Sequence, residues 1–99
     1  MHLRLSPLVP SDLEKIADYI AVDSPRHALR VLALLRTKMK KIARQPKLYR
    51  PRPELGPEAR LAAVGPYVIL FRIRQNSVRI ERVVHGGRDL LPLLDVSES

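Results

Sequence analysis

The first half of the chain begins with a stretch of apolar residues at helical spacing. Four of them recur at i, i+3, i+4 and i+7, which places them on one face of a helix. These are Leu13, Ile16, Ala17 and Ile20. Ser11 or Asp12 is the expected N-cap, because a short side-chain oxygen accepts hydrogen bonds from the free amides of a first helical turn. The pattern therefore predicts an amphipathic helix that starts near these two residues.

A second apolar stripe follows, with the 4-3-4-3 spacing of helices that pack side by side. Its residues are Ala28, Leu32, Leu35, Met39 and Ile42. Asp23 or Ser24 should end the first helix and cap the second, and Pro25 suits a first helical position, where no amide hydrogen is needed. Pro46 should stop the second helix. The first half of the chain is thus predicted to form a helical hairpin.

The second half has the shorter apolar runs that are typical of strands. Tyr67–Arg74 is apolar on both faces, which predicts a central strand. Residues 60–64 precede it and end in the turn signal Gly65-Pro66. Residues 78–84 follow it after a hairpin at Gln75-Asn76-Ser77. These segments predict a small meander of three strands.

Three further segments complete the chain. His2–Leu5 alternates loosely and is expected to be a short strand. Four prolines between residues 46 and 57 predict an extended hinge between the helices and the meander. Residues 89–94 form a short apolar tail, which should fold back on the sheet or meet a partner.

Composition narrows the class of protein. The 99 residues fit one domain, residues 1–99, and no apolar run reaches the roughly 18 residues of a membrane span. The absence of cysteine excludes disulfides and thiol catalysis and fits a cytoplasmic protein. The formal net charge is +8, and the stretch from Arg36 to Arg52 is basic without any acidic residue. Such a stretch is either a solvated helix face or a surface for a polyanion or an acidic protein.

Most motifs that carry chemistry are missing. His2, His27 and His85 are scattered, without carboxylate or cysteine at ligand spacing, so no metal site is predicted. Gly86-Gly87 is the only glycine pair, and neither a Walker loop nor a dinucleotide fingerprint is present. The serines fit caps and turns rather than a catalytic nucleophile. We therefore expect no metal and no cofactor.

Arginines on the predicted strands are the stronger candidates for a site. Arg60 opens the meander, Arg72 lies on the central strand, and Arg82 interrupts an apolar row on the last strand. The alternation of side chains would place Arg82 on one face with Val78, Ile80 and Val84.

With His85 and Arg88 at the end of the sheet, the three arginines could line a cationic surface, because arginine donates bidentate hydrogen bonds to phosphate or carboxylate. The alternative is an internal salt network in which Glu81 or Asp89 neutralises some of them. His85 could act as a general acid or base, or could simply hydrogen-bond a loop carbonyl.

Five segments, in chain order, resemble the RelE/ParE toxin superfamily, and most closely its ParE branch. They are Leu5-Ser6-Pro7 and residues 12–20, 46–56, 64–73 and 80–89. The resemblance implies an α+β fold, with an N-terminal helical hairpin packed on a small, mainly antiparallel sheet of three to four strands. It also implies the toxin of a type II toxin–antitoxin pair, with a cognate antitoxin that wraps it with an acidic or amphipathic segment.

Members of this superfamily differ in target: ParE-like toxins inhibit DNA gyrase, and RelE-like toxins cut messenger RNA in the ribosome. Cleavage through the 2′-hydroxyl needs a base, an acid and cations. No tyrosine follows Val84, and the predicted strands of the meander carry no lysine, which leaves His85, Tyr67 and Glu81 as proton-transfer candidates. This shortage favours a toxin that binds gyrase and has no catalytic residue. Its expected target-binding residues are Arg88, Asp89, Leu90 and Leu91.

The sequence leaves three alternatives to a gyrase-binding toxin open. The first is a ribosome-dependent endoribonuclease that uses His85 with Arg60, Arg72 and Arg82. An inactive homologue and a nucleic-acid-binding module built on residues 36–52 are the others. Direct binding to nucleic acid is disfavoured, because three tyrosines and one phenylalanine offer little surface for base stacking.

Overall fold

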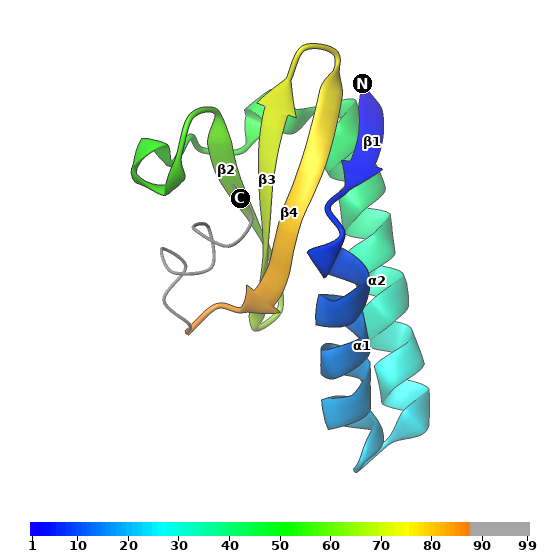
Figure 1. Cartoon of the computed structure of the whole chain (residues 1–99). Coiled ribbons are helices and arrows are strands. Elements are labelled where there is room, and N and C mark those ends of the chain that lie inside the picture. Colours follow the sequence, from blue (N-terminus) through cyan, green and yellow to red (C-terminus); the bar gives the residue numbers. More distant parts are fainter. Residues whose placement is uncertain (88–99) are drawn as a thin grey trace.

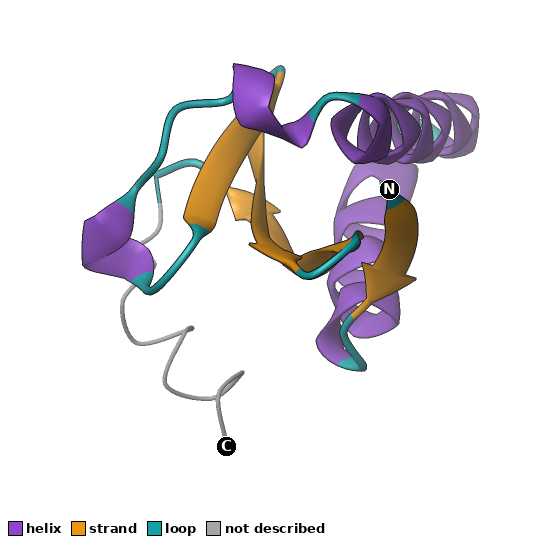
Figure 2. Ribbon diagram, turned by 90° about the horizontal axis from the view of Figure 1, so that it is seen from above, coloured by secondary structure: helices purple, strands orange, loops and turns teal. Residues whose placement is uncertain are grey.

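The computed structural model describes residues 1–87. Two helices, α1 (Leu8–Ala21) and α2 (Pro25–Arg44), form a hairpin that covers one face of a four-stranded sheet (Figure 1). Figure 2 shows from above that both helices lie on the same side of this sheet. The expected α+β architecture is confirmed. The tail at residues 89–94 and the target-binding residues Arg88, Asp89, Leu90 and Leu91 lie outside the described residues.

The sheet combines one parallel pair with two antiparallel pairs. Its strands are β1 (His2–Leu5), β2 (Ala59–Val64), β3 (Tyr67–Arg74) and β4 (Ser77–His85). They are arranged in the order β1-β4-β3-β2, with β1 parallel to β4. β3 has a neighbour on each side, which confirms the central strand that its two apolar faces predicted. The short N-terminal strand is also confirmed.

A serine hydroxyl lies at the start of each helix. Ser24 caps α2 as predicted, because its Oγ accepts the His27 N–H at 3.1 Å, and Pro25 is the first helical residue. The predicted start of α1 at Ser11 or Asp12 is wrong, since the helix begins one turn earlier at Leu8. Ser6 lies just before that turn: its Oγ accepts the Leu8 N–H at 3.2 Å and donates to the Glu81 carbonyl at 2.7 Å. The start of α1 is thereby attached to β4.

Most of the buried apolar surface lies between the helices and the sheet. Leu35 and Ile42 of α2 pack with Ile69 and Phe71 of β3, and all four are fully buried. The opposite face of the sheet holds a smaller cluster of Leu55, Ala59 and Leu70. The proline-rich segment builds part of this second layer. It forms two short 3₁₀ turns, η1 (Pro46–Leu48) and η2 (Pro53–Leu55), rather than the extended hinge that was expected.

A β-bulge shifts the side-chain alternation of β4. Phe71 pairs with Ile80 but its neighbour Leu70 pairs with Arg82, so Glu81 is an extra residue in the strand. In consequence Val83, and neither Arg82 nor Val84, joins Val78 and Ile80 in the main core. The prediction that Arg82 shares a face with Val78 and Ile80 is therefore wrong, whereas Arg82 and Val84, both beyond the bulge, still share one. Strict alternation holds only where a strand has no bulge.

Candidate functional site

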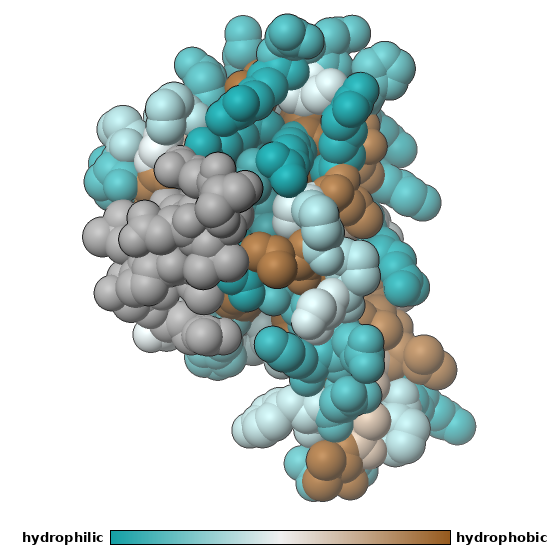
Figure 3. Space-filling model, in the orientation of Figure 1, coloured by the Kyte–Doolittle hydropathy of each residue, from teal (hydrophilic) through white to brown (hydrophobic). Residues whose placement is uncertain are grey.

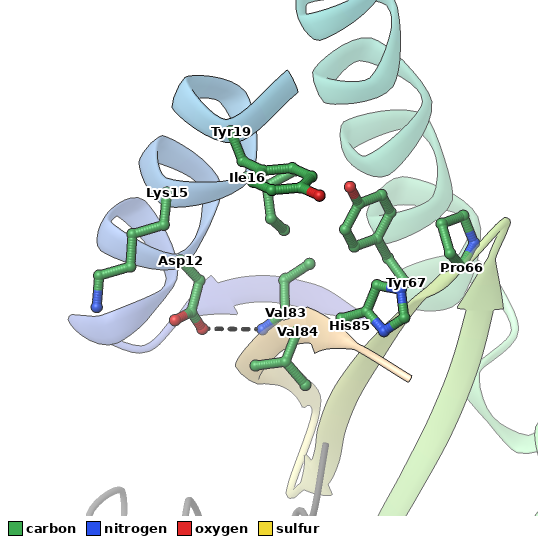
Figure 4. A pocket seen from close by; sticks show the side chains of 9 residues that line it. All are labelled: Asp12, Lys15, Ile16, Tyr19, Pro66, Tyr67, Val83, Val84 and His85. Atoms are coloured by element: carbon green, nitrogen blue, oxygen red, sulfur yellow. Dashed lines mark hydrogen bonds between the residues drawn. The ribbon is translucent and has the colours of Figure 1, made fainter. Parts of the chain in front are cut away.

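Asp12 of α1 covers the part of the β4 edge that is not paired with β1. The β1 pairing ends at Ile80, and from there α1 lies alongside the strand. The buried Asp12 carboxylate accepts the Val83 N–H at 3.0 Å (Figure 4). It also accepts Nε–H and Nη2–H of Arg82, both at 2.8 Å, in a bidentate pair. These hydrogen bonds raise the pKa of Arg82, so its guanidinium remains charged and held against α1.

The other two strand arginines have separate partners. Arg72 Nε lies 4.0 Å from Glu81 Oε1, and both side chains are buried. Arg60 donates from Nη1 to the Tyr49 carbonyl oxygen at 2.6 Å. Arg60 pairs with Phe71, which faces the helices, so Arg60 lies on the helix side of the sheet. Arg72 follows Phe71 in β3 and therefore faces the opposite side. The structure therefore does not bring Arg60, Arg72 and Arg82 to one cationic surface.

A pocket of about 410 Å³ lies between α1 and the end of β4 (Figure 4). Ile16, Val83 and Val84 give it apolar walls, and Lys15 and Tyr19 of α1 stand at its border. On the sheet side, the rings of Tyr67 and His85 meet edge to face, with centroids 6.0 Å apart. The Gly87 N–H donates to His85 Nδ1 at 3.3 Å. Asp12 also lines this pocket, so apolar walls and a few polar groups surround it. Such a pocket suits an apolar side chain of a partner.

A family model described as the ParE toxin of the type II toxin–antitoxin system parDE matches residues 3–90. The chain belongs to the ParE toxin family. The ParE-branch resemblance of the sequence is thus confirmed.

Solved structures support the ParE-like fold of this toxin. It is similar to a chain of the chromosomal ParDE TA system from P. aeruginosa, with a TM-score of 0.74 and 23% sequence identity. The match covers 86% of this toxin and 95% of that chain. At this identity the likeness shows the fold alone. A comparison with curated protein sequences gave no significant match.

The sequence analysis of this ParE-family toxin missed Asp12 as a structural residue. Asp12 precedes Ile16 by four positions, so it lies on the apolar stripe that faces the sheet. A carboxylate within such a stripe is a signal of a buried ion pair, because an unpaired buried charge is costly. The N-cap interpretation of Asp12 obscured this signal.

Two general properties of the described part of the toxin bear on its chemistry. Within residues 1–87, no three His, Cys, Asp or Glu side chains are grouped so that they could hold a metal ion. Neither helix of this part of the chain is both long and apolar enough to cross a bilayer.

Proposed function

We propose that this ParE-family toxin acts in the cytoplasm by binding and inhibiting DNA gyrase, and that a cognate antitoxin neutralises it. The observation that supports a binding mechanism is the Asp12–Arg82 pair. RNA cleavage needs cations aimed at the phosphorane, and Arg82 uses its Nε and Nη2 donors on a carboxylate of its own chain. Arg72 is likewise buried beside Glu81.

The residues proposed to contact gyrase are Arg88, Asp89, Leu90 and Leu91. They follow a strand end that the fold holds firmly. Gly86 N–H donates to the Pro66 carbonyl at 2.8 Å, and Asp12 fixes the backbone of β4 at Val83. The chain therefore leaves the sheet at a defined place, between the β2–β3 turn and the pocket beside α1. A binding segment that starts from a fixed point loses less entropy on binding.

Ribosome-dependent RNA cleavage is the second candidate, and one observation favours it. The His85 imidazole and the Tyr67 phenol lie together at the pocket, where each could exchange a proton with a bound substrate. The only cationic side chain that lines this pocket in the described part of the chain is Lys15. This function would require Lys15 or a ribosomal group to stabilise the charge of the phosphorane.

A supercoiling assay with purified gyrase tests the proposal directly. We expect the toxin to inhibit supercoiling, and we expect an excess of antitoxin to restore it. The matched control is toxin premixed with antitoxin before gyrase is added. Toxin that binds antitoxin but leaves supercoiling unchanged would contradict the proposal. The next measurement would then be cleavage of ribosome-bound messenger RNA, with His85→Ala expected to lower the rate roughly 10²–10⁴-fold if His85 is the acid or base.

A further inference from the structure

The exposed charges of the toxin are unevenly distributed over its described residues. The exposed carboxylates lie in two places, in or just after α1 and beside η2, at Glu14, Asp18, Asp23, Glu54 and Glu58. β1, the β3–β4 turn and residues 24–53 contain no acidic residue. Figure 1 shows the α1–α2 connection at the bottom, and the β3–β4 hairpin with the start of β1 at the top. The top of this view therefore carries exposed basic side chains, and the acidic part of α1 lies toward the other end.

Segments that are far apart in the sequence meet at this end. The His2 N–H of β1 donates to the Asn76 carbonyl in the β3–β4 turn at 3.0 Å. The nitrogen of Met1 donates to the Ala43 carbonyl near the end of α2 at 3.2 Å. The next residue of α2, Arg44, is exposed and lines a hollow together with Met1. The fold thus brings a basic residue of the helix close to those of the sheet.

Three arginines of the sheet line one groove at this end. Arg4, Arg74 and Arg79 surround a space of about 950 Å³. Arg79 lies between two residues of the main core, so its side chain faces away from the helices, and its partner Arg4 in β1 faces the same way. Arg74 is the last residue of β3, beside the turn. We name these three residues and Arg44 the basic end.

The chain itself neutralises only part of this charge. Glu81 lies 3.8 Å from Arg79 and 4.0 Å from Arg72, which is buried. Arg4 and Arg74 form no ion pair with any residue in the range 1–87. Arg4 pairs with Arg79, and Arg79 pairs in turn with Arg72. Like charges directly opposite one another destabilise a sheet, so an anion bound here would relieve an existing repulsion.

The lining of the groove indicates phosphate groups along a polyanion. Its arginines are spread over three neighbouring strands, about 5 Å apart from one strand to the next, so they present charge along a line. Gln75 and Ser77 add the amide and hydroxyl donors that contact phosphate in protein–DNA interfaces. Among the described residues, Leu5 is the one apolar residue of the lining, whereas protein interfaces depend on buried aromatic or apolar anchors. Figure 3 shows mostly hydrophilic residues over this end.

We propose that the basic end binds the phosphate backbone of duplex DNA, and that this DNA is the duplex on which gyrase acts. The inference rests on the proposed function, which supplies gyrase and its DNA. Arginine suits the role because its planar fork donates two hydrogen bonds to one phosphate. Such contacts hold a duplex without reading its sequence. The toxin thereby contacts the enzyme through residues 88–91 and the DNA through the basic end.

Single-stranded nucleic acid fits the basic end less well, because it needs aromatic surfaces on which its bases stack. Tyr49, Tyr67 and Phe71 pack on the main core, and Tyr19 lies on α1. The bases of a duplex stack on one another, so the small number of aromatic residues does not count against duplex DNA. A second copy of the toxin would bring the same cations against this end, which like-charge repulsion opposes.

Fluorescence anisotropy of the full-length toxin with a labelled duplex of about 20 base pairs measures this binding without gyrase. We expect a Kd on the order of 1–100 µM near physiological salt. Four phosphate contacts predict a slope of about −3.6 for log K against log salt concentration, from about 0.9 for each contact. Arg4→Gln and Arg74→Gln should each weaken binding about threefold to tenfold and reduce the size of that slope by about 0.9. Thermal unfolding of each variant separates lost binding from lost folding.

Arg30→Gln is the matched control, because Arg30 is exposed in the first half of α2 and its replacement removes the same charge. It should change the Kd by less than about twofold. Equal weakening by Arg30→Gln and Arg4→Gln, or no binding at low salt, would overturn the proposal. Tighter binding of a single strand of the same length would assign the basic end to single-stranded nucleic acid. Displacement of the duplex by less poly-glutamate than unlabelled duplex would assign it to an acidic protein.

The supercoiling assay then tests whether gyrase supplies the DNA. The double variant Arg4→Gln, Arg74→Gln should need about fivefold or more toxin for half inhibition, while its binding to DNA-free gyrase should be unchanged, since only one of two contacts is lost. An unchanged inhibitory concentration would overturn gyrase-bound DNA as the ligand. Absence of inhibition by the wild-type toxin would refute the proposed function instead. The anisotropy measurement would still decide whether the basic end binds DNA.

Discussion

The carboxylate of Asp12 and the guanidinium of Arg82 join the first helix to the last strand, with two hydrogen bonds of 2.8 Å between residues 70 positions apart. Both residues are buried. Breaking a buried pair by removing one partner typically costs about 3–5 kcal/mol, because the remaining charge has no counter-ion. Removal of either residue is therefore expected to destabilise the fold strongly.

Asp12→Ala should lower the free energy of unfolding by about 3–5 kcal/mol, since it leaves Arg82 unpaired and also removes the acceptor of the Val83 N–H. Urea unfolding monitored by circular dichroism is the measurement. Glu14→Ala, an exposed carboxylate on the same helix, is the control and should change stability by less than about 0.5 kcal/mol. Equal effects of the two substitutions would contradict the role given to the pair.

The pH dependence of this loss follows from the raised pKa of Arg82. A basic group whose pKa is higher in the folded state contributes its full stability below the unfolded pKa and loses it only as the pH rises through the folded pKa. Arginine titrates above about pH 12, so Arg82 stays charged in the usual working range. We expect the stability difference between wild type and Asp12→Ala to be constant between about pH 7 and 10. A steady decline over that range would show that another group titrates with the pair.

Gly56→Ala tests the close contact between η2 and the sheet. Gly56 has φ of +123°, and a Cβ at this position would lie 2.7 Å from Arg72 Nη2. The unfavourable backbone angle and the displaced guanidinium together should cost about 1–3 kcal/mol. Gly65→Ala is the control: its φ is +55° but its Cβ would meet open space. A larger loss at Gly65 than at Gly56 would count against the contact with Arg72.

Ser24→Ala and Ser11→Ala compare the predicted cap that the structure confirms, at the start of α2, with the predicted cap that lies inside α1 instead. Ser24 Oγ accepts an amide hydrogen of α2, so its loss should cost about 1 kcal/mol. Ser11 is exposed within α1, where alanine is the better helix former, so its replacement should be neutral or slightly stabilising. Thermal unfolding of both variants suffices. A destabilised Ser11→Ala with an unaffected Ser24→Ala would reverse the assignment.

Truncation after Gly87 should abolish toxicity and keep antitoxin binding, because the residues proposed to contact gyrase follow this position. The described fold lies entirely within the retained residues. Growth arrest on induction and calorimetric titration with antitoxin are the two measurements. The control is the full-length chain expressed to the same level. A truncated toxin that still arrests growth and inhibits gyrase would place the target contact elsewhere.

Periodicity determined the helical hairpin and the central strand of this toxin, and the resemblance to the ParE branch supplied the α+β fold class. The apolar stripe of α2, its Ser24-Pro25 start and the two apolar faces of β3 are local patterns, and each depends on neighbours within a turn or a hairpin. The order of segments also identified the family. Such features are readable because secondary-structure periods act over a few residues.

Only the tertiary structure decided which residue pairs with each buried charge. Asp12 looks like a helix cap in sequence and is the partner of Arg82, 70 positions away. The bulge at Glu81 depends on pairing with β3, and it moved Arg82 out of the apolar row that alternation had assigned to it. The groove lined by Arg4, Arg74 and Arg79 likewise arises because β1 lies beside β4, far from it in sequence. A buried charge is stable only beside a counter-charge, which can come from any part of the fold. The local spacing of residues therefore does not predict its partner.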